Sequence, residues 1–176
     1  MKNNLFILFF FLLVGCTPNT TVSTNATVKT FCPIVLFSSE HSQYITGNTQ
    51  SITTENIRYR AEINNYVFNS ECSIKDNIFE AELSLLFIVK PDLTEESGIT
   101  LPFYVAVLNI NDEVVDMQYY QADGDLMSES ENVNYIETEL TKTIKFQISS
   151  LNEEGLNENK VVVGFMLDKK KLEILN

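Results

Sequence analysis

The chain has 176 residues, 44% of them hydrophobic, so it is long enough for one domain with a buried core and too apolar for a disordered acidic tail. Its 24 acidic and 12 basic side chains give a formal charge of -12. This charge argues against a nucleic-acid partner, because phosphate binding requires clustered lysine and arginine, and the basic run at 169–171 is typical of a solvated helix face.

The first predicted element is a cleavable export signal over residues 1–15. Lys2 precedes an apolar run over residues 5–14, and no acidic residue occurs before Glu40. The run is half as long as the about 20 apolar residues that a transmembrane helix needs, which indicates a signal peptide. The junction Leu13-Val14-Gly15-Cys16 resembles a bacterial lipobox. That resemblance implies cleavage after Gly15 and a diacylglycerol group on the sulfur of Cys16; the alternative is an ordinary secretory signal beside an unrelated cysteine.

Residues 16–30 are expected to form the lipidated cysteine and a flexible tether rich in Thr, Asn and Ser. Two or three acyl chains anchor a protein stably, so Cys16 would hold the chain on a membrane without spanning it. The lipobox resemblance also gives Thr17 a meaning, because an aspartate there commonly retains lipoproteins in the inner membrane. Thr17 therefore favours the outer membrane, facing the periplasm. The folded domain is expected over residues 31–176, held off anionic head groups by its negative charge.

Cys32 and Cys72 remain once Cys16 carries lipid, and an even pair in an exported protein predicts a disulfide. The alternatives are a metal site and a catalytic thiol. Zinc requires four ligands at characteristic local spacings, and neither cysteine has a second Cys or His within a few residues. We therefore expect a structural disulfide and no metal ligand.

Most of the folded part alternates apolar and polar residues with a period of two, which predicts β-strands with one buried face. The expected strands lie at 57–63, 79–89, 103–110, 114–120, 144–148 and 161–167. The second half of 79–89 is apolar on both faces, so we expect this strand to be central or covered, and Pro91 to end it. Asn111-Asp112 lies between two β-rich runs and predicts a hairpin.

These elements predict an all-β fold, an antiparallel immunoglobulin-like β-sandwich with a short C-terminal helix. Asp168 is expected to cap that helix, with Leu172 and Leu175 on one face. The chain has no tryptophan, so the likeness to antibody domains is one of architecture alone. A small barrel is the alternative.

Three segments together resemble a group of uncharacterised alphaproteobacterial envelope lipoproteins. They are Phe31-Cys32-Pro33 with a second cysteine forty positions on, the strand 101–108, and Val161-Val-Val-Gly-Phe-Met-Leu167 before a short helix. The chain departs from the group at 37–40 and at Asn176, where members carry Ala-Asp-Ala-like residues and an arginine. The resemblance implies an envelope location and this fold, and it implies no activity.

Groups for catalysis are sparse. The one histidine, His41, lies between Ser39 and Ser42, but adjacent residues in a strand do not face each other, and no Gly-x-Ser-x-Gly elbow occurs. Asp123-Gly124-Asp125 and the acidic residues near it offer oxygen ligands for calcium without the register of a calcium loop. We therefore predict no enzyme, no catalytic residue and no cofactor.

The leading hypothesis is a non-enzymatic envelope lipoprotein, attached to the membrane through Cys16, whose domain presents a surface, loop or strand edge to another envelope protein or has a structural role there. Tyr119 and Tyr120 are the candidate contact residues, unless one points to the core and one to solvent. A second hypothesis is a binding or carrier module for a small hydrophobic or cationic ligand, which requires an internal cavity. A third is an envelope hydrolase built on His41 or a carboxylate pair.

Overall fold

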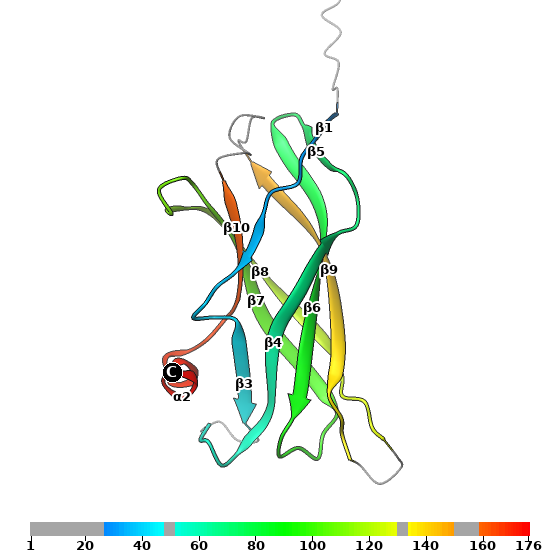
Figure 1. The fold of residues 1–176 in the computed structure, drawn as a ribbon, viewed down its shortest axis with the longest axis vertical. Helices are drawn as coiled ribbons and strands as arrows, with labels where there is room; N and C mark the ends of the chain where they lie inside the picture. The colour runs from blue at the N-terminus through cyan, green and yellow to red at the C-terminus, as the bar shows by residue number, and fades with distance from the viewer. Residues whose placement is uncertain (1–26, 48–51, 130–133, 150–158) are drawn as a thin grey trace, which may run out of the picture.

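The computed structural model describes residues 27–47, 52–129, 134–149 and 159–176. These residues form ten β-strands and a short C-terminal helix, and the strands make two sheets that pack against each other (Figure 1). The predicted all-β sandwich is therefore confirmed.

The larger sheet, sheet A, has six strands with β6 at its centre. β6 pairs with β4 and β5 along one side and with β9 along the other. This confirms the central position predicted for the 79–89 run. The strands of sheet A are β1 (Val28–Thr30), β3 (Gln43–Gly47), β4 (Ile57–Phe68), β5 (Cys72–Lys75), β6 (Ile78–Pro91) and β9 (Thr138–Ser149).

The smaller sheet, sheet B, has four strands in the order β2-β10-β7-β8. Its strands are β2 (Val35–Phe37), β7 (Gly98–Leu108), β8 (Val114–Asp125) and β10 (Lys160–Phe165). The predicted hairpin at Asn111-Asp112 joins β7 to β8, and the N–H of Asn109 donates to the main-chain oxygen of Glu113 at 3.0 Å. β2 pairs with β10 in parallel, an exception to the predicted antiparallel order. The exception arises because β2 reaches sheet B by a crossover from sheet A, whereas only a hairpin forces antiparallel pairing.

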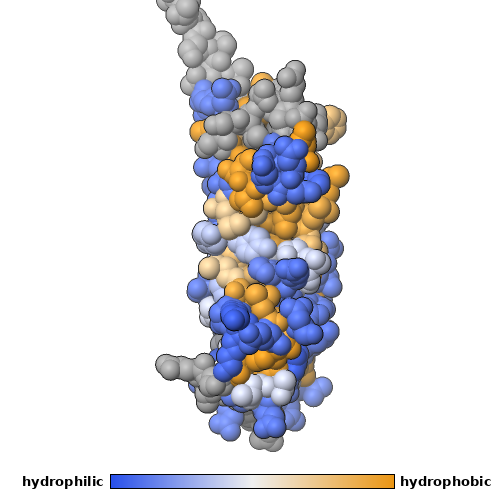
Figure 2. Space-filling view, turned by 90° about the vertical axis from the view of Figure 1, so that its left-hand side faces the viewer, coloured by the Kyte–Doolittle hydropathy of each residue, from blue (hydrophilic) through white to orange (hydrophobic). Residues whose placement is uncertain are grey.

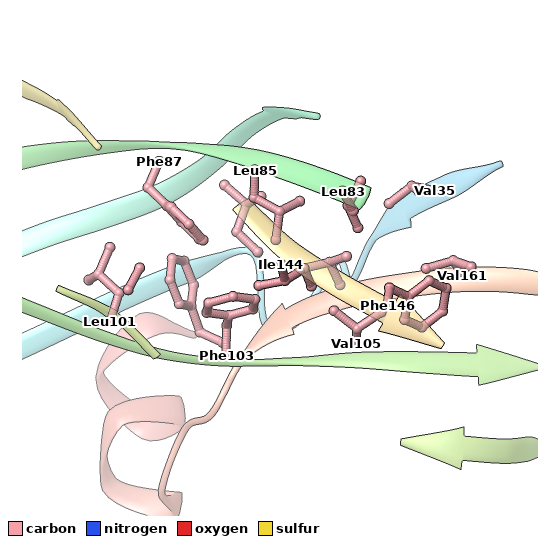
Figure 3. Packing of buried hydrophobic residues seen from close by; sticks show 14 of the residues in the cluster. Val35, Leu83, Leu85, Phe87, Leu101, Phe103, Val105, Ile144, Phe146 and Val161 are labelled. Carbon is pink, nitrogen blue, oxygen red and sulfur yellow. The ribbon is translucent and has the colours of Figure 1, made fainter. Parts of the chain in front are cut away.

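The space between the sheets is filled by large side chains, which Figure 3 shows from close by. Phe87 of β6 lies between rings of the opposite sheet, with centroids 5.4 Å from Phe103 and 5.7 Å from Phe165. All three rings are fully buried. Aromatic side chains bury 150 to about 250 Å² each, so these rings account for much of the stability of the sandwich.

The ordered fold begins earlier than the sequence indicated. Residues through Thr30 were assigned to the tether, but Val28–Thr30 form β1 and pair with β5. Thr30 lies opposite Cys72 in this register, and Cys72 is bonded to Cys32 two residues on from Thr30. The disulfide therefore holds this polar segment against the sheet, which composition alone does not reveal.

The helix α2 (Lys169–Leu175) lies beside β3, at the side of the half of the molecule that is away from β1 (Figure 1). The predicted cap is confirmed, because the side chain of Asp168 accepts from the N–H of Lys171 at 2.9 Å. The ammonium of Lys171 donates to the hydroxyl of Tyr44 in β3 at 3.0 Å. Leu175 and Ile174 pack on a small cluster made by Ile45, Ile52 and Ile57, whereas Leu172, predicted to share a face with Leu175, is not part of that contact.

Candidate functional site

The cysteines fall into two groups. Cys16 lies outside the described residues, so its lipidation stays a prediction. Cys32 and Cys72 form the predicted disulfide, with their Cα atoms 5.2 Å apart, and Cys72 is fully buried. The bond joins the segment between β1 and β2, which leads from sheet A into sheet B, to the first residue of β5 in sheet A. Its role is therefore structural.

His41 does not assemble a hydrolytic site in the described part of the chain. It lies between β2 and β3, and its Nδ1 atom is 3.3 Å from the hydroxyl of Tyr104. The two rings are edge to face, with centroids 5.8 Å apart. Both ring contacts of His41 among the described residues are thus with Tyr104, and neither Ser39 nor Ser42 is brought to the imidazole.

The acidic segment at the end of β8 is occupied by local hydrogen bonds. Asp123 accepts from Thr100 at 3.2 Å and from Gln121 at 2.7 Å, and Asp125 accepts from Ser97 at 2.8 Å. Across the described ranges, no three Asp, Glu, His or Cys side chains lie close enough to hold a metal ion together. Glu131, part of the calcium hypothesis, lies outside those ranges.

An open cavity of about 660 Å³ lies against the loop between β6 and β7, with Arg58 in its wall. Arg58 donates to the hydroxyl of Thr94 at 3.0 Å and to the main-chain oxygens of Glu96 and Gly98 at 3.2 and 2.8 Å. Its guanidinium also pairs with the carboxylate of Glu96 at 3.3 Å. The role of Arg58 is therefore to hold this loop.

The carrier hypothesis requires space between the sheets, and three cavities among the described residues lie elsewhere. Besides the cavity at the β6–β7 loop, two smaller ones lie at sheet A: one is lined by β5, β6, β9 and the loop before β5, and the other by β3, β4, β6 and Leu175 of α2. The aromatic rings of Figure 3 fill the interior instead. These observations do not favour a ligand held inside the sandwich.

Two tyrosines connect the sheets from within, and each has a raised pKa. The hydroxyl of Tyr59 donates to the main-chain oxygen of Thr100 and accepts from its N–H, both at 2.9 Å. Burial raises the pKa of Tyr59. Burial, with a smaller contribution from the Asp116 carboxylate, also raises the pKa of Tyr120.

Tyr119 and Tyr120 are divided between the two faces of β8. The ring of Tyr120 stacks on Phe103 in the core, with centroids 5.5 Å apart. Tyr119 is 62% exposed and points away from sheet A. The division that the sequence analysis named as the alternative is therefore the observed one, and Tyr119 alone is available on the surface.

The outer face of sheet B, which points away from sheet A, has an apolar centre that crosses all four strands, with polar and charged residues toward the strand ends; we call it the sheet B face. The registers align one cross-strand row, whose members alternate with core residues along each strand: Leu36, Val162, Ala106 and Met117. The next row toward α2 contains Gly164, Tyr104 and Tyr119. Leu36 is 45% exposed. Figure 2 shows hydrophobic surface in both the upper and the lower half of this side of the molecule, with hydrophilic residues between the two areas.

The outer face of sheet A is different, because it carries charged side chains in ion pairs. Lys90 lies 3.6 Å from the carboxylates of both Glu62 and Glu137. Arg60 lies 3.6 Å from the carboxylate of Asp92. A sandwich with two solvated faces would be polar on both, as sheet A is. The apolar surface of sheet B is therefore the unusual feature of this fold, and contiguous exposed apolar surface marks interaction sites.

The strand edges on the β8 side are less suited to a partner than this face. The hydroxyl of Tyr120 donates to the main-chain oxygen of Lys145 at 3.3 Å, and the side-chain amide of Gln118 donates to the main-chain oxygen of Gln147. Side chains of β8 thus satisfy backbone groups of β9, the edge strand of sheet A. Because an added strand needs unpaired backbone groups, these contacts disfavour strand addition to β9.

The sheet B face was not predictable from the sequence as a whole. The available indication was the nearly continuous apolar run at 103–108, since a strand with both faces covered lacks the alternation of a half-solvated one. Leu36 and Met117 gave no such indication, because they reach this face only through the pairing of β2 with β10 and of β8 with β7.

In the described ranges, no helical segment has the length and apolar character needed to cross a bilayer. No protein-family model matches the chain, and neither the curated proteins nor the solved structures contain a match. The candidate site therefore depends on its own geometry: an apolar sheet face on a disulfide-bonded β-sandwich.

Proposed function

We propose that this chain is a non-enzymatic lipoprotein of the bacterial cell envelope, anchored through Cys16, whose β-sandwich binds another envelope protein through the sheet B face. The observation that carries the proposal is the row of Leu36, Val162, Ala106 and Met117, in which no polar residue interrupts the surface across the sheet. Ala106 is 2% exposed, but Leu36, Val162 and Met117 are accessible to water. Water contact with these apolar side chains is unfavourable, and a protein surface that covers them removes that cost.

The size of the face fits a protein better than a small molecule. The row crosses four strands about 4.8 Å apart, so it spans about 14 Å across the sheet, and the second row lies about 6.8 Å further along the strands. Small-molecule sites are concave and surround most of their ligand. An open sheet face cannot surround a ligand, but it matches one side of a small protein interface.

The place where the chain enters the domain also leaves the sheet B face accessible to another protein. The described residues begin at the end of the molecule that carries β1, and the strands run along its long axis (Figure 1). A tether attached at that end leaves the side of the sandwich unobstructed. The sheet B face would therefore point along the membrane, toward other proteins of the same layer.

Comparative affinity enrichment tests the proposal. The full-length tagged protein, solubilised from the envelope of its own cells, is compared with Met117→Glu on the sheet B face and with Thr141→Glu, an exposed position on the outer face of sheet A. Each variant adds one negative charge at the middle of a strand. The proposal predicts a protein that is recovered with the unmodified chain and with Thr141→Glu and is lost with Met117→Glu. Equal recovery with both variants would contradict it.

The anchor requires a separate measurement. Mass spectrometry of the purified protein is expected to show a chain that starts at Cys16 and carries acyl groups, whereas Cys16→Ser is expected to keep its leader and stay unlipidated. An intact leader on the unmodified chain would contradict the lipoprotein assignment. It would leave the test of the sheet B face unaffected.

A further inference from the structure

We infer that the protein bound by the sheet B face presents an apolar patch bordered by lysine or arginine side chains. The inference rests on the proposed function and names the chemistry of the partner. It is drawn from the distribution of charge around the face, which follows one strand, β8.

Acidic side chains lie beyond both ends of the apolar stretch of β8. At the hairpin end are Asp112 and Glu113, and at the other end are Asp123 and Asp125, all four exposed. Asp123 and Asp125 belong to the outward-pointing set of β8, because their partners Thr100 and Gly98 alternate with the buried residues of β7. Between these ends the outward-pointing residues are uncharged: Val115, Met117, Tyr119 and Gln121.

The basic side chain on this face is already neutralised. Lys160 of β10 lies in the row of Leu108 and Val114, and its ammonium is 2.9 Å from Asp112 Oδ1. One ion pair therefore leaves the acidic residues in excess around the face. A partner surface with the opposite charge at its rim would bring complementary groups together.

The remaining carboxylates have acceptor capacity for such contacts. The hydrogen bonds to Glu113, Asp123 and Asp125 use one oxygen of each: Oε2 of Glu113, from Asn109, and Oδ1 of both aspartates. An ionised carboxylate accepts at both oxygens and binds arginine with two parallel hydrogen bonds. Lysine or arginine of a partner can thus be added without breaking the local bonds.

Other occupants fit less well. A second copy of this chain has the same acidic rim and the same formal charge of -12, so a symmetric contact would place carboxylates near carboxylates. Anionic lipid head groups would be repelled for the same reason. A basic-rimmed protein surface is the occupant that both the apolar centre and the acidic border favour.

Photo-crosslinking in intact cells tests the inference on the full-length protein. p-Benzoylphenylalanine replaces Tyr119 on the sheet B face, and in a parallel chain it replaces Thr141 on the outer face of sheet A. The attachment site on any crosslinked protein is mapped by mass spectrometry. The charge of the acidic rim, formed by Asp112, Glu113, Asp123 and Asp125, is then reversed at two positions with Glu113→Lys and Asp123→Lys together. The matched control is Glu95→Lys with Glu139→Lys, which changes the charge equally at exposed positions away from the face.

The expected result is a crosslink from position 119 to a segment in which lysine or arginine flanks apolar residues, with a yield about tenfold lower after rim reversal and unchanged in the control, because steering of this kind depends on local charge. Thermal melts check that both double variants fold. If the reversed rim fails to fold, Glu113→Gln with Asp123→Asn replaces it and is expected to lower the yield by a smaller factor.

The other outcomes separate the two levels of the argument. A crosslink to an acidic segment of another protein would overturn the inferred partner chemistry and leave the proposed function in place. A crosslink whose yield is the same before and after rim reversal would have the same consequence. A crosslink only to a second copy, or only to lipid, would overturn the inference in favour of self-association or membrane contact. Absence of any crosslink from position 119 would overturn both the inference and the proposed function.

Discussion

Reduction of the disulfide is expected to remove a large part of the stability of the domain. Cys32 and Cys72 are 40 residues apart, so in the chain-entropy model the crosslink contributes about 4 kcal/mol by restricting the unfolded chain. Native domains are stable by only about 5 to 15 kcal/mol. For a domain of this size, the loss corresponds to a decrease of about 10 to 15 °C in Tm.

The assay is urea unfolding, followed by circular dichroism, with and without dithiothreitol in a Cys16→Ser background that prevents thiol exchange with Cys16. Cys32→Ala with Cys72→Ala serves as the control, because the reductant should leave its unfolding curve unchanged. The denaturant dependence m should increase on reduction, since an uncrosslinked chain exposes more surface when unfolded. A loss below about 1 kcal/mol, or an equal response of the cysteine-free control, would refute the reasoning that the bond acts on the unfolded state.

Two further predictions concern the core and its surface. A Cβ atom at Gly164 would lie 2.6 Å from the Tyr104 hydroxyl, so Gly164→Ala should lower the free energy of unfolding by about 1 to 3 kcal/mol. The control Gly98→Ala should leave it unchanged, because there is open space around Gly98. Equal urea midpoints for the two variants would contradict this prediction. Because the pKa of Tyr59 is raised in the fold, its phenol ionises first in the unfolded chain. The contribution of Tyr59 to the free energy of unfolding is therefore complete below pH 10, its pKa in the unfolded chain, and is lost as the pH rises through its pKa in the fold. Thermal melts at increasing pH should show a shallower alkaline decline of Tm for Tyr59→Phe than for the unmodified chain. An identical decline would exclude Tyr59 as the cause. At neutral pH the same variant should lose about 1 kcal/mol, since it leaves the main-chain groups of Thr100 without their partner.

Local patterns in the sequence were sufficient for the main strands and for the pair of cysteines. The alternation over 57–63, 79–89 and 144–148 reports which side of a strand is buried, and this information is local. The hairpin between β7 and β8 and the cap at Asp168 were likewise visible, because turn and cap preferences depend on a few neighbouring residues. Once Cys16 was assigned to lipid, two cysteines left one simple pairing, and the Cys32–Cys72 bond is observed.

The short strands were not predictable in the same way. β1, β2 and β5 have three or four residues each, too few to show a period. They are extended because neighbours that are distant in sequence supply their hydrogen bonds: β5 holds β1, and β10 holds β2 in parallel. Their positions follow from the crossover between the sheets, which no local pattern encodes.

The sequence by itself determined that the chain builds a domain of β-strands with one disulfide, because hydrophobic period, turn chemistry and cysteine number act over short distances. Only the tertiary structure decided which surface is apolar. Leu36, Ala106, Met117 and Val162 lie far apart along the chain and become one surface only when the registers of three strand pairs align them. A surface of this kind is a property of strand pairing. The acidic residues along β8 can be recognised as its border only once that pairing is known.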